Sequence, residues 1–478
     1  MRTVRPVMLR DLYANPDLLD NNAAIPDDRQ LRRALRRGLG SAIVFLQNTD
    51  NKQHYRDIVL SYCLRDIGYD TQSEGSKGPY LYFAICALGD PAYFENPVIE
   101  RFLSTCQYHL AQQLTDLLLC FARDGHQASI EALRAKYAQF EAERKLRNGR
   151  TIDGWQWEYV ASALLDIDGF TAFKRYVTDV GQYLRRVPDG HGLYYDWFIS
   201  MANKKFGKRR ASAFLDPSSA SRRTEREQDA VRTLAITMAK DEDTWQSRRQ
   251  SHTNQPLTAQ DVHQWAQESV ANGSRDGSIG RIFRKNSTDK EKLKLAQAIL
   301  DEPDETVKGW MLRAFYRQPF PLGPEPLLPY LHTKNERLRD SAVGTLEVCH
   351  DEQVHEAAVR LLETQGLDSG GLALLEANYR RSDDAVIAVA MRHYRNNLPH
   401  FIVGVLGLIY TRHRSANAAP VLLRSYREGE CAFCRFGIVQ AMQRSGTLPP
   451  DILNECQYDS YEDTRKLARR LIGPTDPC

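Results

Sequence analysis

Hydrophobic residues in the second half of the chain recur at positions that fall on one side of a helix. In DETVKGWMLRAF, residues 304–315, Val307, Met311 and Phe315 are spaced by four. Residues at this spacing share one stripe of a helix, so the pattern predicts an amphipathic helix with Lys308 beside its buried face. The same spacing begins at Leu338, Cys434 and Thr464, which are followed by Arg339, Arg435 and Arg465.

These patterns are separated by nearly constant intervals. The interval is 31 residues from 307 to 338, 30 from 434 to 464, and 96, or three units of 32, from 338 to 434. Two degenerate copies fit in the long interval, at 370–381 and 398–410, without the basic residue. Second apolar helices such as EPLLPYLH and DDAVIAVAMRHYR lie between the copies. A helical hairpin of this length buries its apolar faces only by stacking on neighbours, which predicts an α-solenoid.

Three segments share a short pattern: an acidic residue or Asn, then an apolar or small residue, then directly a basic one. They are DETVKGWMLRAF, NERLRDSAVGTL and YEDTRKLARRLI. In this they resemble the HEAT-like repeat family over roughly residues 300–473. The period is shorter than the approximately 40 to 47 residues of full HEAT units and is similar to that of compact members. The tetratricopeptide family has a similar length, but its Trp-x-x-Leu-Gly-x-x-Tyr signature is missing. The resemblance implies stacked helical hairpins with a long surface for a partner.

The first half is also a succession of helical patterns, such as QHYRDIVLSYCLRDIG and HLAQQLTDLLLCFARDG, without a countable period. Strand-like alternation is scarce. The sequence therefore predicts an all-α fold, an α-solenoid of HEAT-like helical hairpins with an all-helical N-terminal half. We expect an N-terminal domain at 1–207, a polar Ser/Arg-rich connection with one helix at 208–260, and the repeat solenoid at 261–478.

Composition is that of a globular protein, with 42% hydrophobic and 26% charged residues among 478. The longest apolar run, FIVGVLGLIY at 401–410, is shorter than the roughly 20 residues that span a bilayer. Residues 1–17 lack the continuous apolar stretch of a secretory signal. We expect a cytoplasmic protein without membrane contact, whose nine cysteines are reduced and mostly buried.

Motifs for metal or cofactor chemistry fail on spacing. CAFC, 431–434, is the only Cys-x-x-Cys, and Cys434 already belongs to an apolar stripe. In HDEQVH, 350–355, the two histidines are five apart rather than four, and Asp351 is suited to cap a helix that excludes His350. GSRDGSIGR, 273–281, and EGSKG, 74–78, lack the order of a phosphate loop or a nucleophile elbow. We expect no metal, no cofactor and no catalytic residue.

Two sets of residues are candidates for partner contacts. The loop YDTQSEGSKGPYLYF, 69–83, places Asp70, Glu74 and Lys77 between two apolar helices, although a capped helix end explains the same residues. The basic residues that follow the stripes could form a ladder beside the inner surface, or could each pair with an acidic side chain of the adjoining repeat. They are Lys308, Arg339, Arg435 and Arg465.

Nucleic acid is an alternative partner. The formal net charge is only +3, but residues 204–226 contain eight basic side chains, Arg222 among them, and two acidic ones, a local charge of +6. A solvated Ser/Arg loop has the same composition. GWQWEYVASALLDIDGF, 154–170, adds aromatic residues, whose ordinary role is core packing. The candidate phosphate contacts are Lys204, Lys205, Lys208, Arg209 and Arg210.

Our leading hypothesis is a non-catalytic scaffold that binds a protein or peptide on a curved helical-repeat surface. The alternative is a nucleic-acid-binding or DNA-repair protein, because the resemblance extends to DNA glycosylases built on compact HEAT-like folds. A bilin-lyase type of enzyme also rests on this resemblance. Fold alone does not decide between these functions.

Overall fold

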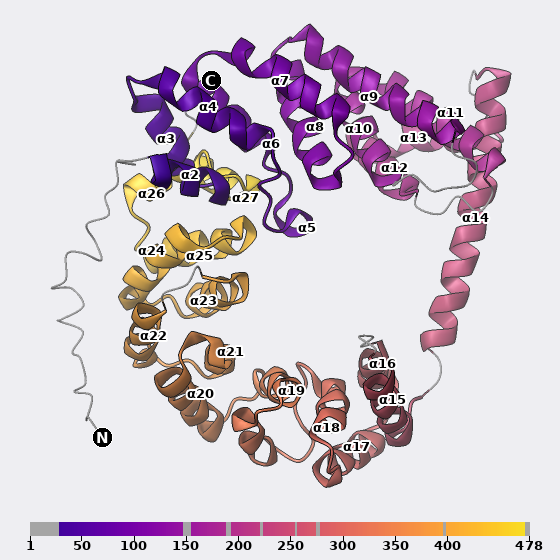
Figure 1. Ribbon diagram of the computed structural model, residues 1–478. Coiled ribbons are helices and arrows are strands. Elements are labelled where there is room, and N and C mark those ends of the chain that lie inside the picture. The colour runs from indigo at the N-terminus through magenta and orange to yellow at the C-terminus, as the bar shows by residue number, and fades with distance from the viewer. Residues whose placement is uncertain are drawn as a thin grey trace. The chain divides into compact units, whose positions relative to one another are not determined.

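The computed structural model describes residues 28–146, 154–187, 193–219, 223–253, 256–273, 278–394 and 398–473. Every regular element in these ranges is an α-helix or a 3₁₀ helix, and none is a strand (Figure 1). The all-α prediction is therefore confirmed. None of the helices that the structure describes is long and apolar enough to cross a bilayer.

The chain divides into two compact units. One, the terminal unit, comprises residues 24–246 and 450–478; the other, the central unit, comprises residues 247–449 together with 1–23, which lie outside the described ranges. Helix α14 (Glu225–Thr253) runs across the boundary at 246/247. The predicted connection at 208–260 contains this helix and α13 (Lys208–Leu215). The domain boundaries expected from the sequence stay a prediction.

The central unit is a succession of short helices. Its elements are α15 (Ala259–Asn272), α16 (Ser278–Asn286), α17 (Asp289–Asp301), α18 (Glu305–Leu312), η2 (Arg313–Phe315), η3 (Glu325–His332), α19 (Glu336–Leu346), α20 (Glu352–Gln365), η4 (Leu367–Ser369), α21 (Gly371–Asn378), α22 (Asp383–His393), α23 (His400–His413), η5 (Ala416–Ala418), α24 (Ala419–Glu428) and α25 (Ala432–Ser445).

Alternate helices of this unit form a row. Helix α18 packs on α19, α19 on α21, α21 on α23 and α23 on α25, so these five helices make up what we call the first-helix row (Figure 1). The elements η3, α20, α22 and α24 come between them in the chain and pack on the row or on one another. The pattern that predicted helical hairpins thus corresponds to two sets of helices that alternate along the chain.

Side-chain caps start several of these helices. Asp304 accepts hydrogen bonds from the backbone N–H of Thr306 and Val307, at 2.7 and 3.1 Å, and begins α18. Asp351 caps α20 in the same way, so that His350 lies outside the helix as the sequence predicted. These short polar side chains satisfy backbone donors that a helix leaves without partners in its first turn.

The predicted apolar stripes form the core. Val307, Leu338, Cys434 and Thr464 are all buried, as are the residues four positions after each of them. Helices α23 and α25 approach closely because glycines face each other: a Cβ on Gly407 would lie 3.2 Å from the backbone of Gly437.

The terminal unit contains the remaining helices, from both ends of the chain. They are α2 (Asp28–Arg37), α3 (Gly40–Asn48), α4 (Lys52–Cys63), α5 (Thr71–Glu74), α6 (Gly78–Leu88), α7 (Pro91–Ser104), α8 (Tyr108–Arg123), α9 (Gln127–Leu146), α10 (Gly154–Ile167), α11 (Phe170–Arg186), α12 (Tyr195–Phe206), α13, most of α14, α26 (Pro450–Cys456) and α27 (Glu462–Ile472).

The last two helices pack within this unit. The Ser460 N–H donates to the carbonyl oxygen of Gly38 at 2.9 Å, and Tyr458 meets Phe83 of α6 edge to face. Helix α26 lies so close to α3 that a Cβ on Gly40 would be 1.7 Å from the carbonyl oxygen of Glu455. Residues 450–473 therefore complete the packing of helices that precede them by more than 350 residues.

The structure has no disulfide among the eight cysteines it describes. Cys63, Cys431, Cys434 and Cys456 are buried, whereas Cys86 and Cys106 are exposed. Burial, which raises the pKa of a thiol, raises that of Cys120 to about 12. The expectation of buried thiols holds for half of the described cysteines.

Candidate functional site

The four predicted basic residues occupy one position in their helices. Each is the fourth residue, and its N–H donates to the carbonyl oxygen of the residue that precedes the helix. The N–H to oxygen distances are 2.8 Å for Lys308, 3.0 Å for Arg339, 3.0 Å for Arg435 and 3.3 Å for Arg465.

Their side chains have different surroundings. Lys308 Nζ lies 3.3 Å from the hydroxyl of Tyr330, over whose ring it also sits. Arg435 is fully buried in the central unit, and Arg465 belongs to the terminal unit, where it donates to two backbone carbonyl oxygens. The Arg339 guanidinium lies 4.0 Å from the carboxylate of its neighbour Asp340. Whether these residues bind a partner stays a prediction.

The loop residues Asp70, Glu74 and Lys77 have contacts within the terminal unit. Lys77 Nζ donates to the carbonyl oxygens of Arg36 and Ile67, at 2.8 and 3.0 Å, and lies 3.7 Å from Glu74 Oε1. Both charged side chains are buried. Asp70 is half-buried and accepts a hydrogen bond from a serine hydroxyl of α5. The loop thus ties α6 to the carboxyl end of α2.

The predicted phosphate contacts lie at the end of α12 and the start of α13. All five side chains, of Lys204, Lys205, Lys208, Arg209 and Arg210, are exposed. Lys205 pairs with Asp166, which also binds Arg123, and Arg210 lies over the ring of Phe170. Arg222 lies outside the described residues.

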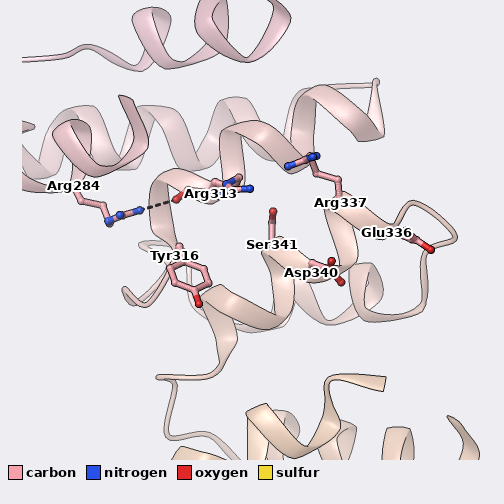
Figure 2. A pocket seen from close by; sticks show the side chains of 7 residues that line it. All are labelled: Arg284, Arg313, Tyr316, Glu336, Arg337, Asp340 and Ser341. Atoms are coloured by element: carbon pink, nitrogen blue, oxygen red, sulfur yellow. Dashed lines mark hydrogen bonds between the residues drawn. The ribbon is translucent and has the colours of Figure 1, made fainter. Parts of the chain in front are cut away.

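The central unit contains a pocket of about 630 Å³ that the sequence did not predict (Figure 2). We call it the arginine pocket, because Arg284 of α16, Arg313 of η2 and Arg337 of α19 line it. Figure 2 shows Arg313 and Arg337 directed toward each other, with the Ser341 hydroxyl between and below them. The other lining residues are Tyr316, Glu336 and Asp340.

A buried tryptophan holds two of these arginines. The guanidinium carbons of Arg337 and Arg313 lie 4.0 and 5.4 Å from the centre of the Trp310 ring. Trp310 itself packs edge to face on Trp265, at 5.3 Å between centroids. Stacking on the ring face orders both side chains, and because a guanidinium stacks through its face, the N–H edge of Arg313 stays available for a planar anion.

Close helix packing creates the pocket. A Cβ on Gly309 of α18 would lie 2.9 Å from the Arg337 side chain and from the Leu338 backbone. Because Gly309 has no side chain, α19 can approach α18 and bring Arg337 against Trp310. On the opposite wall, the ring of Tyr316 rests on Gly344, where a Cβ would be 2.4 Å from it.

The electrostatics of the pocket favour an anion. Burial, with the nearby charges of Arg281 and Arg313, lowers the pKa of Arg284. The Asp340 side chain is 77% exposed and lies 4.0 Å from Arg339, which is not one of the residues that line the pocket. Glu336 lies at the edge, with its carboxylate directed away from Arg313 and Arg337 (Figure 2). Positive charge is therefore concentrated at the centre of the pocket.

The first-helix row also exposes large apolar side chains. Phe401 and Leu408 of α23 and Phe433 of α25 are 47%, 52% and 49% exposed. Arg337, Phe401 and Phe433 are each the second residue of their helix. Equivalent positions of helices in one row thus carry an arginine in α19 and phenylalanines in α23 and α25.

The terminal unit has a half-exposed aromatic cluster formed by Trp155, Tyr159, Tyr194 and Trp197. The Trp197 centroid lies 4.7 Å from that of Trp155 and 6.1 Å from that of Tyr159, whose ring is nearly parallel. The Tyr159 hydroxyl donates to Asp116 at 2.8 Å, and burial raises the pKa of that carboxyl. The sequence indicated Trp155 and Tyr159 but not the contribution of α12.

The cysteine and histidine motifs singled out in the sequence make contacts inside the protein. Cys434 is buried on its stripe, 3.9 Å from His400 Nδ1. His355 is buried and lies 3.1 Å from both carboxylate oxygens of Asp383. Among the residues that the structure describes, no group of three or more His, Cys, Asp and Glu side chains is placed to hold a metal ion.

Comparisons of this chain with protein-family models, curated proteins and solved structures find no match. The features of the structure that can indicate a function are the arginine pocket, the exposed apolar residues of the first-helix row and the aromatic cluster.

Proposed function

We propose that the chain is a protein-binding scaffold whose central unit is an α-solenoid of HEAT-like helical hairpins. Its first-helix row would bind an extended segment of a partner protein on the face that carries Arg337, Phe401 and Phe433. The proposal includes no reaction and no cofactor.

The observation that supports it most is the chemistry of this face. Arg337 of α19 lines the arginine pocket, and Phe401 of α23 and Phe433 of α25 are half exposed. Exposed apolar clusters of this kind are typical of interaction sites, and Phe and Arg are enriched where binding energy is concentrated. A partner segment with an anionic group and apolar side chains would complement both parts.

The spacing of the helices limits the length of this segment. Packed helices lie about 8 to 10 Å apart, so the three steps from α19 to α25 cover roughly 30 Å. An extended peptide rises about 3.3 Å per residue, so about nine residues would reach from the arginine pocket to Phe433. Recognition of short extended segments by repeat proteins has this scale.

Site-specific photo-crosslinking in the native host tests the proposal. A benzophenone amino acid at position 408 is expected to capture one partner protein, with the adduct in a short segment that has apolar and anionic residues. The control is position 293 on α17, outside the row, where Leu293 is 49% exposed, close to the exposure of Leu408. Equal capture at both positions, or none at 408, would refute the proposal.

Nucleic-acid binding is a second candidate, favoured by the aromatic cluster. Trp197 lies on α12, the helix that ends with Lys204 and Lys205, so stacking faces and positive charge come from one element. A gel shift with single-stranded DNA would show binding that falls steeply with salt and is weakened by Trp197→Ala. Absence of binding at low salt would exclude this function.

A further inference from the structure

The arginine pocket contains more hydrogen-bond donors than the surrounding protein uses. Among the described residues, no carboxylate lies within ion-pair distance of the Arg284 or Arg313 guanidinium. Arg284 makes one hydrogen bond, to the carbonyl oxygen of Arg313 at 2.8 Å. These two arginines therefore keep several N–H groups for another molecule.

Ser341 is an independent indication of a ligand. The residue is only 5% exposed and lines the pocket, and its hydroxyl points toward Arg313 and Arg337 (Figure 2). No described residue forms a hydrogen bond with this hydroxyl. The accessible part of this nearly buried residue faces the pocket, so its hydroxyl can donate to a polar group bound there.

We propose that the arginine pocket binds a phosphate monoester, presented by a phosphorylated serine or threonine of the bound segment. This inference rests on the proposed function and specifies the anionic group of the partner. The Arg284, Arg313 and Arg337 side chains would bind the phosphate oxygens, and the Ser341 hydroxyl would donate to one of them.

The number of donors distinguishes phosphate from carboxylate. One guanidinium satisfies both oxygens of a carboxylate through two parallel hydrogen bonds. Three guanidiniums and a hydroxyl match a group with three acceptor oxygens and a charge of about −1.5 to −2. The pocket volume of about 630 Å³ also leaves room for the peptide chain that carries the phosphate.

The surroundings favour a peptide over a nucleic acid. Trp310, beneath the arginines, is buried and offers no face for stacking a base, and the exposed Tyr316 has one side of its ring against Gly344. A phosphodiester also has only two non-bridging oxygens and a single charge. The row continues from the pocket to Phe401 and Phe433, which suit apolar side chains rather than a sugar-phosphate backbone.

Calorimetric titration of the full chain tests the phosphate assignment with four probes: blocked phosphoserine, blocked O-sulfoserine, blocked glutamate and a thymidine decamer. At pH 7.5, phosphoserine is expected to bind at least tenfold more tightly than glutamate. With a second phosphate pKa near 6, the dianion fraction rises about fourfold from pH 5.5 to 7.5, and the affinity should rise with it. O-sulfoserine is a monoanion throughout, so its titration reports any effect of Asp340, Glu336 or other protein groups.

Two variants assign the binding to the pocket. Arg313→Gln is expected to weaken phosphoserine binding at least tenfold, and Ser341→Ala about threefold or more, with unchanged circular dichroism. Arg360→Gln is the matched control, because Arg360 is exposed on α20, outside the row, and should retain affinity within twofold.

Three results would overturn the inference: equal affinity for phosphoserine and glutamate, unchanged binding in Arg313→Gln, or tighter binding of the decamer than of phosphoserine with the same sensitivity to Arg313→Gln. If phosphoserine fails while position 408 still captures its partner, only the phosphate assignment is wrong. If position 408 captures nothing while phosphoserine binds, the scaffold proposal fails instead.

Discussion

Replacement of Lys77 by Met is expected to destabilise the terminal unit strongly. The ammonium group is buried, donates to the carbonyl oxygens of Arg36 and Ile67, and lies 3.7 Å from Glu74. In Lys77→Met, both carbonyl groups lose a charged donor and Glu74 loses the positive charge 3.7 Å from its carboxylate. Glu74 still accepts two backbone N–H groups, from Tyr69 at 2.7 Å and from the next residue at 3.2 Å.

The structure sets the magnitude. Two opposite charges 3.7 Å apart attract by about 4.5 kcal/mol at an effective dielectric constant of about 20. Part of this attraction is offset because Met, unlike Lys, needs no hydration when it is buried. Removal of one partner from a buried pair typically costs about 3–5 kcal/mol, and we expect a value in that range.

Hydrogen exchange with mass spectrometry is the appropriate assay, because the chain has two units and one melting temperature would not separate them. Lys77→Met should lower the opening free energy of residues 28–41 and 64–78, while α23 keeps its protection. Lys208→Met removes an exposed lysine and should change the opening free energy of these residues by less than about 0.5 kcal/mol.

A double-mutant cycle with Glu74→Gln isolates the pair, and the coupling should exceed about 1 kcal/mol. Exchange that is unchanged by Lys77→Met, with loss of partner binding in the same variant, would refute the structural role. Lys77 would then act as the partner contact that the loop composition indicated.

Three further predictions concern packing and ionisation in the terminal unit. Gly40→Ala should lower the free energy of unfolding of the terminal unit by about 1–3 kcal/mol or more, because the new Cβ would lie 1.7 Å from the Glu455 carbonyl oxygen. Hydrogen exchange of α26 should become faster, and unchanged exchange there would contradict the packing. Iodoacetamide at pH 8 should modify exposed Cys106 well before Cys120, whose pKa of about 12 suppresses the thiolate, as peptide mapping would show. Burial raises the pKa of Asp116, so the folded state binds its proton more tightly than the unfolded chain, and this stabilisation is lost as pH rises through the raised pKa. Asp116→Asn should therefore gain stability relative to the parent between pH 4 and 7 in thermal melts, and a constant difference would argue against the shift.

The helices could be predicted because their signal is local. Stripes such as Val307, Met311 and Phe315 specify which side of a helix is buried, and all three residues are buried. Capping residues such as Asp351 indicate where a helix begins. Both features depend on residues within a few positions of one another, so one sequence suffices to recognise them.

The packing of 450–473 with the terminal unit had no such signal. Thr464 follows the same spacing as Val307, and both are buried, so the stripe states only that a helix needs a neighbour. Which neighbour it takes depends on matched surfaces, such as Gly40 beneath Glu455, that lie hundreds of residues apart. Neither residue is unusual within its own segment.

The arginine pocket was missed for a similar reason. Arg313 and Arg337 are 24 positions apart and, in sequence, each looks like an ordinary solvated side chain of an amphipathic helix. They converge because Gly309 lets α19 approach α18 and because Trp310 lies under both. A glycine followed by a tryptophan, one helix before an arginine, is the signal that could have indicated the site.

The basic residues after the stripes show how a regular position in sequence can take part in packing. The fourth position of α18, α19, α25 and α27 carries a basic residue, and packing involves it, because Arg435 is buried and Lys308 bonds to Tyr330 within the central unit. The residue at the second position differs, from Arg337 to Phe401, although in α21 it is Leu372, which is buried. Stacking needs the stripe alone, so specificity for a partner can develop only at positions that stacking leaves free. In α23 and α25 the second position is exposed, with Phe401 and Phe433 about half accessible, whereas partner binding by the basic residues at the fourth position stays a prediction.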